Sequence, residues 1–111
     1  MTAATHQAAA LVYITCPTID EAETIGRELL ERRLVACVNI LPGVVSLYRW
    51  KGDVTRDSEI VMIAKTRLSL AGQVTDAVRK IHSYETPAIT IFRAESVEKN
   101  YLDWIFEETA R

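Results

Sequence analysis

The sequence is poor in several residue types whose abundance would point to a particular class of protein. Its 111 residues include two cysteines, four glycines and three prolines. Two cysteines without CxxC spacing make no disulfide framework. With 49% hydrophobic and 25% charged residues and so little glycine and proline, the composition is that of a globular chain and not of a disordered one. Thirteen basic and fifteen acidic residues give a net charge of -2, so the basic excess typical of nucleic-acid binders is missing.

Signals for membranes and export are also absent. No apolar stretch approaches the roughly 20 residues that a membrane-spanning helix needs. Residues 1–10 contain no lysine or arginine, which fits neither a secretory nor a transit peptide. We therefore expect a flexible tail over residues 1–9, one folded domain over residues 10–111 and a cytoplasmic location, with neither a membrane nor a nucleic acid as partner.

Hydrophobic periodicity divides the chain into alternating strands and helices. Strands are predicted from apolar or alternating patterns over residues 11–16, 35–40, 44–50, 58–66 and 88–93. Helical spacing predicts helices after Thr18, over 70–81 and over 97–105. Thr18 and Glu21 have capping-box spacing, Pro42-Gly43 predicts a bulge, and residues 51–53 predict a hairpin turn.

The resulting order is β-α-β-β-α-β with a C-terminal helix, which indicates an α+β, ferredoxin-like sandwich. The hairpin of the second and third strands is extended, because fully paired arms would span roughly 45 Å at about 3.4 Å per residue. A domain of this size is only about 30 Å across. The hairpin must extend beyond its core, and its exposed apolar edge would promote aggregation unless another chain segment paired with it. We expect other copies of the chain to cover this edge in a closed symmetric oligomer. The alternative is a hairpin that curls onto its own domain.

Motifs of the common enzyme classes are missing. The four glycines stand apart, which excludes a glycine-rich phosphate loop, and neither GxSxG nor HExxH occurs. His6 lies in the expected tail, which leaves His82 as the candidate general base. The loop over residues 16–20 is acidic and lacks the arginine of ferredoxin-like acyl-phosphate hydrolases. We expect a protein that is not an enzyme.

Cys16 and His82 form a candidate pair of soft metal ligands. In a ferredoxin-like sheet, the end of the first strand and the loop before the last strand can lie at the same edge. Thiolate and imidazole suit copper or zinc, although zinc sites use three or four protein ligands. The alternative, which spacing alone favours, is that Cys16 is a core residue and His82 is a helix C-terminal residue favoured by the helix dipole.

Several motifs occur in the order typical of the CutA divalent-cation tolerance family, which the chain resembles over about residues 10–108. They are Thr15-Cys16-Pro17, LVACVNI at 34–40, Pro42-Gly43-Val44, SLYRWKG at 46–52, Glu59, Lys65-Thr66, HSYETP at 82–87 and YLDW at 101–104. The resemblance implies a ferredoxin-like subunit, a homotrimer built through the long hairpins, and a role in tolerance of copper and other divalent metals.

The resemblance also implies a ligand set. The family's suggested copper ligands are a cysteine ending the first strand, a histidine after the second helix and a glutamate following the proline of the histidine motif. Cys16 and His82 match, but Ala88 follows Pro87 and has no donor atom; Glu85 is a differently placed substitute. Copper or another divalent metal is thus the implied ligand, bound weakly and not required for folding.

We accordingly expect a homotrimeric divalent-cation tolerance protein that responds to metal ions and binds copper weakly. The alternative is a trimeric small-ligand or signalling scaffold without a physiological metal. Its cleft between subunits, or equally a packed interface, would contain Trp50, Lys65, Tyr84 and Trp104.

Overall fold

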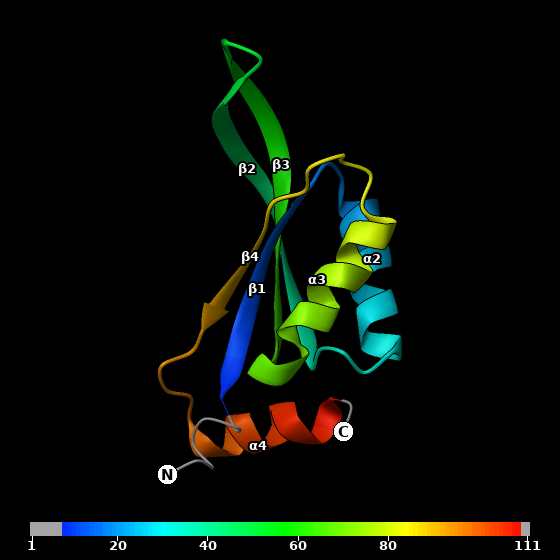
Figure 1. Cartoon of the computed structure of the whole chain (residues 1–111), viewed down its shortest axis with the longest axis vertical. Coiled ribbons are helices and arrows are strands. Elements are labelled where there is room, and N and C mark those ends of the chain that lie inside the picture. The colour runs from blue at the N-terminus through cyan, green and yellow to red at the C-terminus, as the bar shows by residue number, and fades with distance from the viewer. Residues whose placement is uncertain (1–7, 110–111) are drawn as a thin grey trace.

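The computed structural model describes residues 8–109 as a four-stranded antiparallel sheet with helices on one face and at one end (Figure 1). Its elements are β1 (Ala9–Cys16), α2 (Ile19–Glu31), β2 (Cys37–Trp50), β3 (Asp53–Arg67), a 3₁₀ turn (Leu68–Leu70), α3 (Ala71–Ile81), β4 (Ile89–Arg93) and α4 (Lys99–Glu108). The strand order β2-β3-β1-β4 confirms the predicted ferredoxin-like fold. None of the helices described is long and apolar enough to cross a membrane.

The main core lies between the sheet and the two long helices. Alternate residues of β1 face these helices, so Val12, Ile14 and Cys16 are fully buried. Helices α2 and α3 lie on the same side of the sheet (Figure 1), and their apolar residues pack against these strand residues in one cluster. Tyr13 and Thr15 alternate with the buried residues and therefore belong to the opposite, open face of the sheet.

The start of α2 is fixed by the predicted cap. The Thr18 hydroxyl oxygen accepts a hydrogen bond of 3.1 Å from the Glu21 backbone N–H. The Glu21 carboxylate serves another purpose, because it accepts 3.0 Å hydrogen bonds from both the backbone N–H and the hydroxyl of Ser83. Glu21 thereby connects the first turn of α2 to the loop that follows α3.

The hairpin has the predicted bulge and the predicted length. Its register shifts between Leu41 and Val44, where Gly43 has a φ of 76°. Lys51 and Gly52 both have positive φ, as expected of a two-residue turn that matches the twist of a hairpin. The molecule measures 48 × 26 × 22 Å, and Figure 1 shows the hairpin extending past the helices along the long axis. The hairpin therefore overhangs its own core, and the curled alternative is wrong.

Several strand boundaries differ from the prediction, since β2 begins at Cys37 and not at residue 35, and the starts of β1 and β3 are earlier than expected. β1 begins at Ala9, inside the expected tail, because Ala9 pairs with Arg67 of β3. β3 begins at Asp53, since its polar first residues pair across the hairpin although they lack an alternating pattern. Residues 1–7 of the expected tail lie outside the described residues.

The C-terminal helix closes the end of the sheet remote from the hairpin. Ile105 packs with Ala9 and Ala36 in a second, small apolar cluster. Two arginines hold the end of α4: Arg67 donates to the Phe106 carbonyl at 2.6 Å and Arg33 to the Glu107 carbonyl at 2.9 Å. These bonds satisfy carbonyls that a helix terminus leaves without a partner.

Candidate functional site

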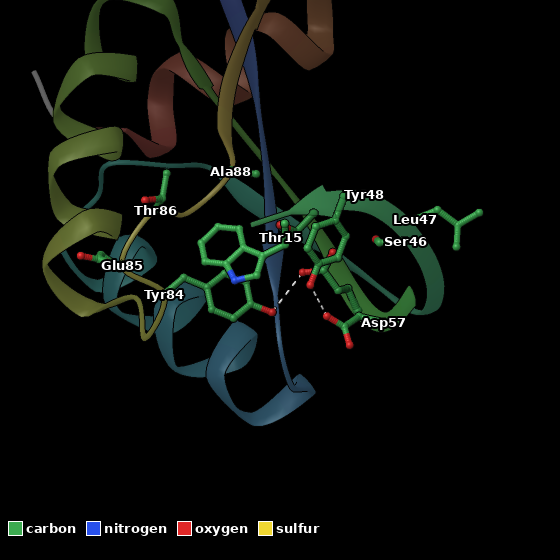
Figure 2. Close-up of a pocket in the computed structure, with 11 residues that line it drawn as sticks. Thr15, Ser46, Leu47, Tyr48, Asp57, Tyr84, Glu85, Thr86 and Ala88 are labelled. Carbon is green, nitrogen blue, oxygen red and sulfur yellow. Dashed lines mark hydrogen bonds between the residues drawn. The ribbon is translucent and has the colours of Figure 1, made fainter. Parts of the chain in front are cut away.

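A pocket of about 580 Å³ lies between the overhanging hairpin and the loop before β4 (Figure 2). Thr15 at the end of β1 forms one part of its wall, and the loop before β4 contributes Tyr84 to Ala88 except for Pro87. The hairpin contributes the rest, namely Ser46, Leu47, Tyr48, Trp50, Asp57 and Glu59. Glu59 and Thr15 alternate with residues that face the helices, so the pocket opens on the opposite face of the sheet.

Hairpin register brings the polar residues of the pocket together. Ser46 pairs with Asp57 and Tyr48 pairs with Thr55, which makes Tyr48 and Asp57 diagonal neighbours on one face. The Tyr48 hydroxyl donates a hydrogen bond to Asp57 Oδ2. This bond, followed by burial and the charges of Asp57 and Glu59, raises the pKa of the Tyr48 phenol.

A second phenol reaches a carboxylate from the loop. The Tyr84 hydroxyl donates to Glu59 Oε2 at 3.0 Å. Burial raises the pKa of Tyr84 most, and the hydrogen bond and charge of Glu59 raise it further. Figure 2 shows the Tyr48 and Tyr84 side chains converging from β2 and from the loop. Both phenols therefore stay protonated at neutral pH and donate to their carboxylates.

His82 fixes this loop to the end of β1. The last pair between β1 and β4 is Ile14–Ile89, so the Thr15 carbonyl lies beyond the ladder, and His82 Nε2 is 2.7 Å from it. The Tyr84 backbone N–H donates to His82 Nδ1 at 3.0 Å. Because Nδ1 accepts and the carbonyl can only accept, the neutral ring carries its proton on Nε2.

Cys16 is a core residue in this structure. Its Sγ lies 3.5 Å from Met62 Sδ, and its side chain is fully buried on the helix-covered face of the sheet. Burial, together with the charges of Glu21 and Glu59, raises the pKa of the Cys16 thiol from 9.0 to about 11. The thiolate that would bind a metal is therefore disfavoured at neutral pH.

The donor set does not fit a preformed metal centre. The Cys16 thiol lies in the core, and both ring nitrogens of His82 already have backbone partners. Within residues 8–109, no three histidine, cysteine, aspartate or glutamate side chains are grouped as a metal site. Ala88 borders the pocket but adds no donor. Metal binding by Cys16 and His82 stays a prediction.

The four residues predicted for a cleft or interface fall into two clusters within one chain. Trp50 and Tyr84 line the pocket. Lys65 and Trp104 instead both contact Tyr101 of α4: the Lys65 ammonium lies 5.8 Å from its ring centroid, and the Trp104 ring stacks on it at 5.7 Å. A cleft that joins the two clusters across subunits stays a prediction.

Tyr48 and Asp57 were not singled out from the sequence as candidate site residues. The signal that could have found them is the two-residue turn at Lys51 and Gly52. It fixes which residues oppose each other along the hairpin and so places Tyr48 beside Asp57. The Tyr84–Glu59 contact depends on the path of a loop, for which the local sequence carries no comparable signal.

Comparison with known proteins agrees with the fold and the motifs. The sequence model described as CutA1 divalent ion tolerance protein matches residues 10–108. The divalent-cation tolerance protein CutA of Archaeoglobus fulgidus is 45% identical over 96 residues, which cover 86% of this chain and 93% of that protein. The human protein CutA is 40% identical over 97 residues, which cover 87% of this chain and 54% of that protein. The chain thus spans about half the length of the human and mouse relatives.

Solved structures extend the likeness to three dimensions. The divalent cation tolerance protein of Thermus thermophilus superposes with a TM-score of 0.88 at 38% identity, covering 92% of this chain and 99% of that one. CutA1 of Oryza sativa gives a TM-score of 0.90 at 33% identity, covering 93% of this chain and 94% of that one. By family match, sequence identity and shared fold, the chain belongs to the CutA1 divalent ion tolerance protein family.

Proposed function

We propose that the protein takes part in divalent-cation tolerance as a homotrimer joined through its β2–β3 hairpins, and that it binds copper or another divalent metal weakly. Family membership supports the first part. The observation that carries the assembly is the overhanging hairpin, on which the Leu47 and Val54 side chains are each 69% exposed in the single chain. Apolar surface gathered on an extended element marks an interaction surface.

The sheet also offers two different edges for pairing. β2 is one outer strand and β4 is the other, and Ile91 and Phe92 of β4 are exposed. A contact between unlike edges of neighbouring copies repeats around a ring if the rotation closes. Such a ring would cover both edges and remove the aggregation hazard that open strands create. The number of three subunits comes from the family resemblance.

Weak metal binding agrees with the protonation of the Cys16 thiol and with the hydrogen bonds that His82 already makes. Cys16 would have to lose its proton inside the core, and His82 would have to give up a backbone partner. Both changes oppose binding, since a metal must compete with the proton and with the existing contacts of each ligand. Ala88 supplies no third donor.

Light scattering and copper titration test this proposal together. The protein should be a trimer at micromolar concentration, and a monomer would contradict the assembly. Copper should bind loosely to a His6→Ala background, in which His6 cannot mimic a site. The double change Cys16→Ala with His82→Ala should abolish this binding, whereas Cys37→Ala should leave it unchanged. An unchanged affinity in the double variant would show that the ligand pair is wrong.

Restoring the third family position sharpens the same test. Ala88→Glu adds a carboxylate at the position where the family pattern has one, and we expect copper to bind about tenfold more tightly, roughly 1.4 kcal/mol. Thr86→Glu, in the same loop, is the matched control. In cells that lack their own family member, the wild-type chain should restore growth in copper, and an assembly-deficient hairpin variant should not.

A second candidate function is a trimeric scaffold that binds a small organic ligand. The observation that favours it is the pocket between the hairpin and the loop before β4, whose volume of about 580 Å³ in the single chain suits a small molecule and far exceeds a metal ion. A ligand that binds the native state raises the melting temperature. Thermal-shift measurements with organic compounds and with copper therefore separate this candidate from the first.

A further inference from the structure

Among the residues that the structure describes, the charged ones that line the pocket are all acidic. Asp57, Glu59 and Glu85 are among its lining residues, and no lysine, arginine or histidine is among the described residues that line it. Figure 2 shows the Asp57 carboxylate beside Tyr48, within the cluster of phenols and acids. A ligand with net negative charge would be repelled from this wall, and a cation would be attracted to it.

The hydrogen-bonding capacity of the acidic wall is also one-sided, whereas the hydroxyls of Thr15, Ser46 and Thr86 and the Trp50 indole N–H can donate elsewhere in the pocket. The Tyr48 and Tyr84 hydroxyl protons are already donated to Asp57 and Glu59, so these phenols are not free to donate to a ligand. Each carboxylate can accept several hydrogen bonds at its two oxygens, and each uses part of that capacity on a tyrosine. The acidic wall of the pocket is therefore rich in acceptors and suits a ligand that carries donors.

Aromatic rings form the remaining wall. Tyr48, Trp50 and Tyr84 come from two separate segments and line one cavity, and Trp50 is 53% exposed. The faces of such rings attract ammonium and guanidinium groups, with tryptophan the most favourable. The Lys51 ammonium, which does not line the pocket, lies 5.8 Å from the Trp50 ring centroid and would have to move aside for a ligand cation.

From this combination we infer that the pocket binds an organic cation, an ammonium or guanidinium group carried on an apolar or aromatic body. The cationic head lies between Asp57 and Glu59, and the body lies against Trp50 and Tyr84. In the single chain, the volume of about 580 Å³ leaves room for a body as well as a head. Because Tyr48 and Trp50 lie on the hairpin that is proposed to meet neighbouring copies, the site in the trimer is a cleft between subunits. This inference rests on the second candidate function, since it names the class of ligand for that site.

Isothermal titration calorimetry of the full chain with benzyltrimethylammonium tests the inference. This probe has a permanent charge and an aromatic body. Benzyl alcohol is the neutral comparison and benzenesulfonate the anionic one, all measured at low ionic strength because salt screens exposed charges. We expect the cation to bind at least tenfold more tightly than either comparison.

Two variants place the binding in the pocket. Asp57→Asn with Glu59→Gln removes the two charges at nearly constant shape and should lower the affinity for the cation at least tenfold. Glu23→Gln, on the exposed face of α2, should leave that affinity unchanged. Trp50→Leu should weaken it to a similar extent, whereas Trp104→Leu at the far end should not. Light scattering on each variant shows whether assembly is kept, and the double amide variant is decisive because it leaves the apolar surface intact.

The outcomes separate this inference from the function on which it rests. Selective binding of the cation that the double amide variant loses supports it. Benzenesulfonate binding that Trp50→Leu abolishes would overturn the ligand class while leaving a ligand-binding scaffold in place. Binding of the cation with equal affinity to the double amide variant would also overturn it. Failure of all three probes would overturn both the inference and the second candidate function.

Discussion

The two halves of β3 lie in the same ladder with β2 but in different surroundings. From Ile60 onward, β3 pairs with β1 on its other side, and Met62 and Ala64 are fully buried beneath the helices. Before Ile60, β3 pairs with β2 alone, and Val54 is largely exposed. Backbone pairing thus continues far beyond the apolar core. A two-stranded ribbon is marginal on its own, so the inner half is stabilised by the subunit and the outer half needs a partner.

The largest effect should come from charges on the outer half. Val45→Asp with Leu47→Asp would place unpaired carboxylates in the proposed interface, at a cost of several kcal/mol per chain. We expect dissociation of the trimer, seen by light scattering. Leu30→Asp on α2, where the leucine is 42% exposed, is the matched control and should leave assembly unchanged. A double variant that stays trimeric and equally heat-resistant would show that these side chains face water.

A substitution in the core beneath the inner half of β3, at Leu29 of α2, should come next. Leu29 is fully buried, whereas its neighbour Leu30 is exposed. Leu29→Ala should lower the free energy of unfolding by about 2–5 kcal/mol, and Leu30→Ala should change it by no more than about 0.5 kcal/mol. Urea unfolding at a fixed protein concentration measures both, since assembly makes stability depend on concentration. Equal effects of the two substitutions would break the distinction between core and surface on α2.

A smaller loss is expected from the cap of α2. Thr18→Ala removes the acceptor of the Glu21 backbone N–H and should cost about 1 kcal/mol in unfolding free energy. Thr75→Ala is the control, because the Thr75 hydroxyl donates to the Ala71 carbonyl within α3 and caps no helix end. Both variants should remain trimeric by light scattering. If the Thr18→Ala trimer dissociated, the stability of the subunit core and the assembly through the hairpins would not be independent.

The last effect concerns pH and is absent in neutral solution. Because the thiol pKa is raised from 9.0 to about 11 in the folded chain, the folded state keeps a proton that the unfolded state releases between these values. The contribution of this proton to the free energy of unfolding is fully present below pH 9 and is lost as the pH rises toward 11. The urea midpoints of wild type and Cys16→Ala should therefore approach each other from pH 9 to 11. Between pH 6 and 8 their difference should stay constant, and the same constancy up to pH 11 would contradict the prediction.

Most of the fold could be predicted because its signals are local. The Thr18 cap, the bulge at Gly43 and the turn at Gly52 depend on a few adjacent residues, and the overhang followed from counting residues in the strands. The start of β1 was missed because Ala9 has weak strand propensity and is held by pairing with Arg67.

The site was harder to predict because its contacts join distant positions. Tyr84 and Glu59 are 25 residues apart, and His82 and Thr15 are 67 apart. Such contacts depend on the path of the loop before β4. Cys16 illustrates the same point: its position at the end of β1 is visible in the sequence, but the burial of its thiol beside Met62 is a result of packing.

The placement of the two tryptophans makes the chain its own optical probe. Trp50 ends β2 near the hairpin tip and Trp104 lies in α4, elements that Figure 1 shows at opposite ends of the molecule. With no other tryptophan in the chain, the emission of a Trp104→Phe protein comes from Trp50. A blue shift of that emission would report that an apolar neighbour has covered the hairpin. The converse variant, Trp50→Phe, would report the environment of α4, so that the two regions can be followed separately without an attached dye.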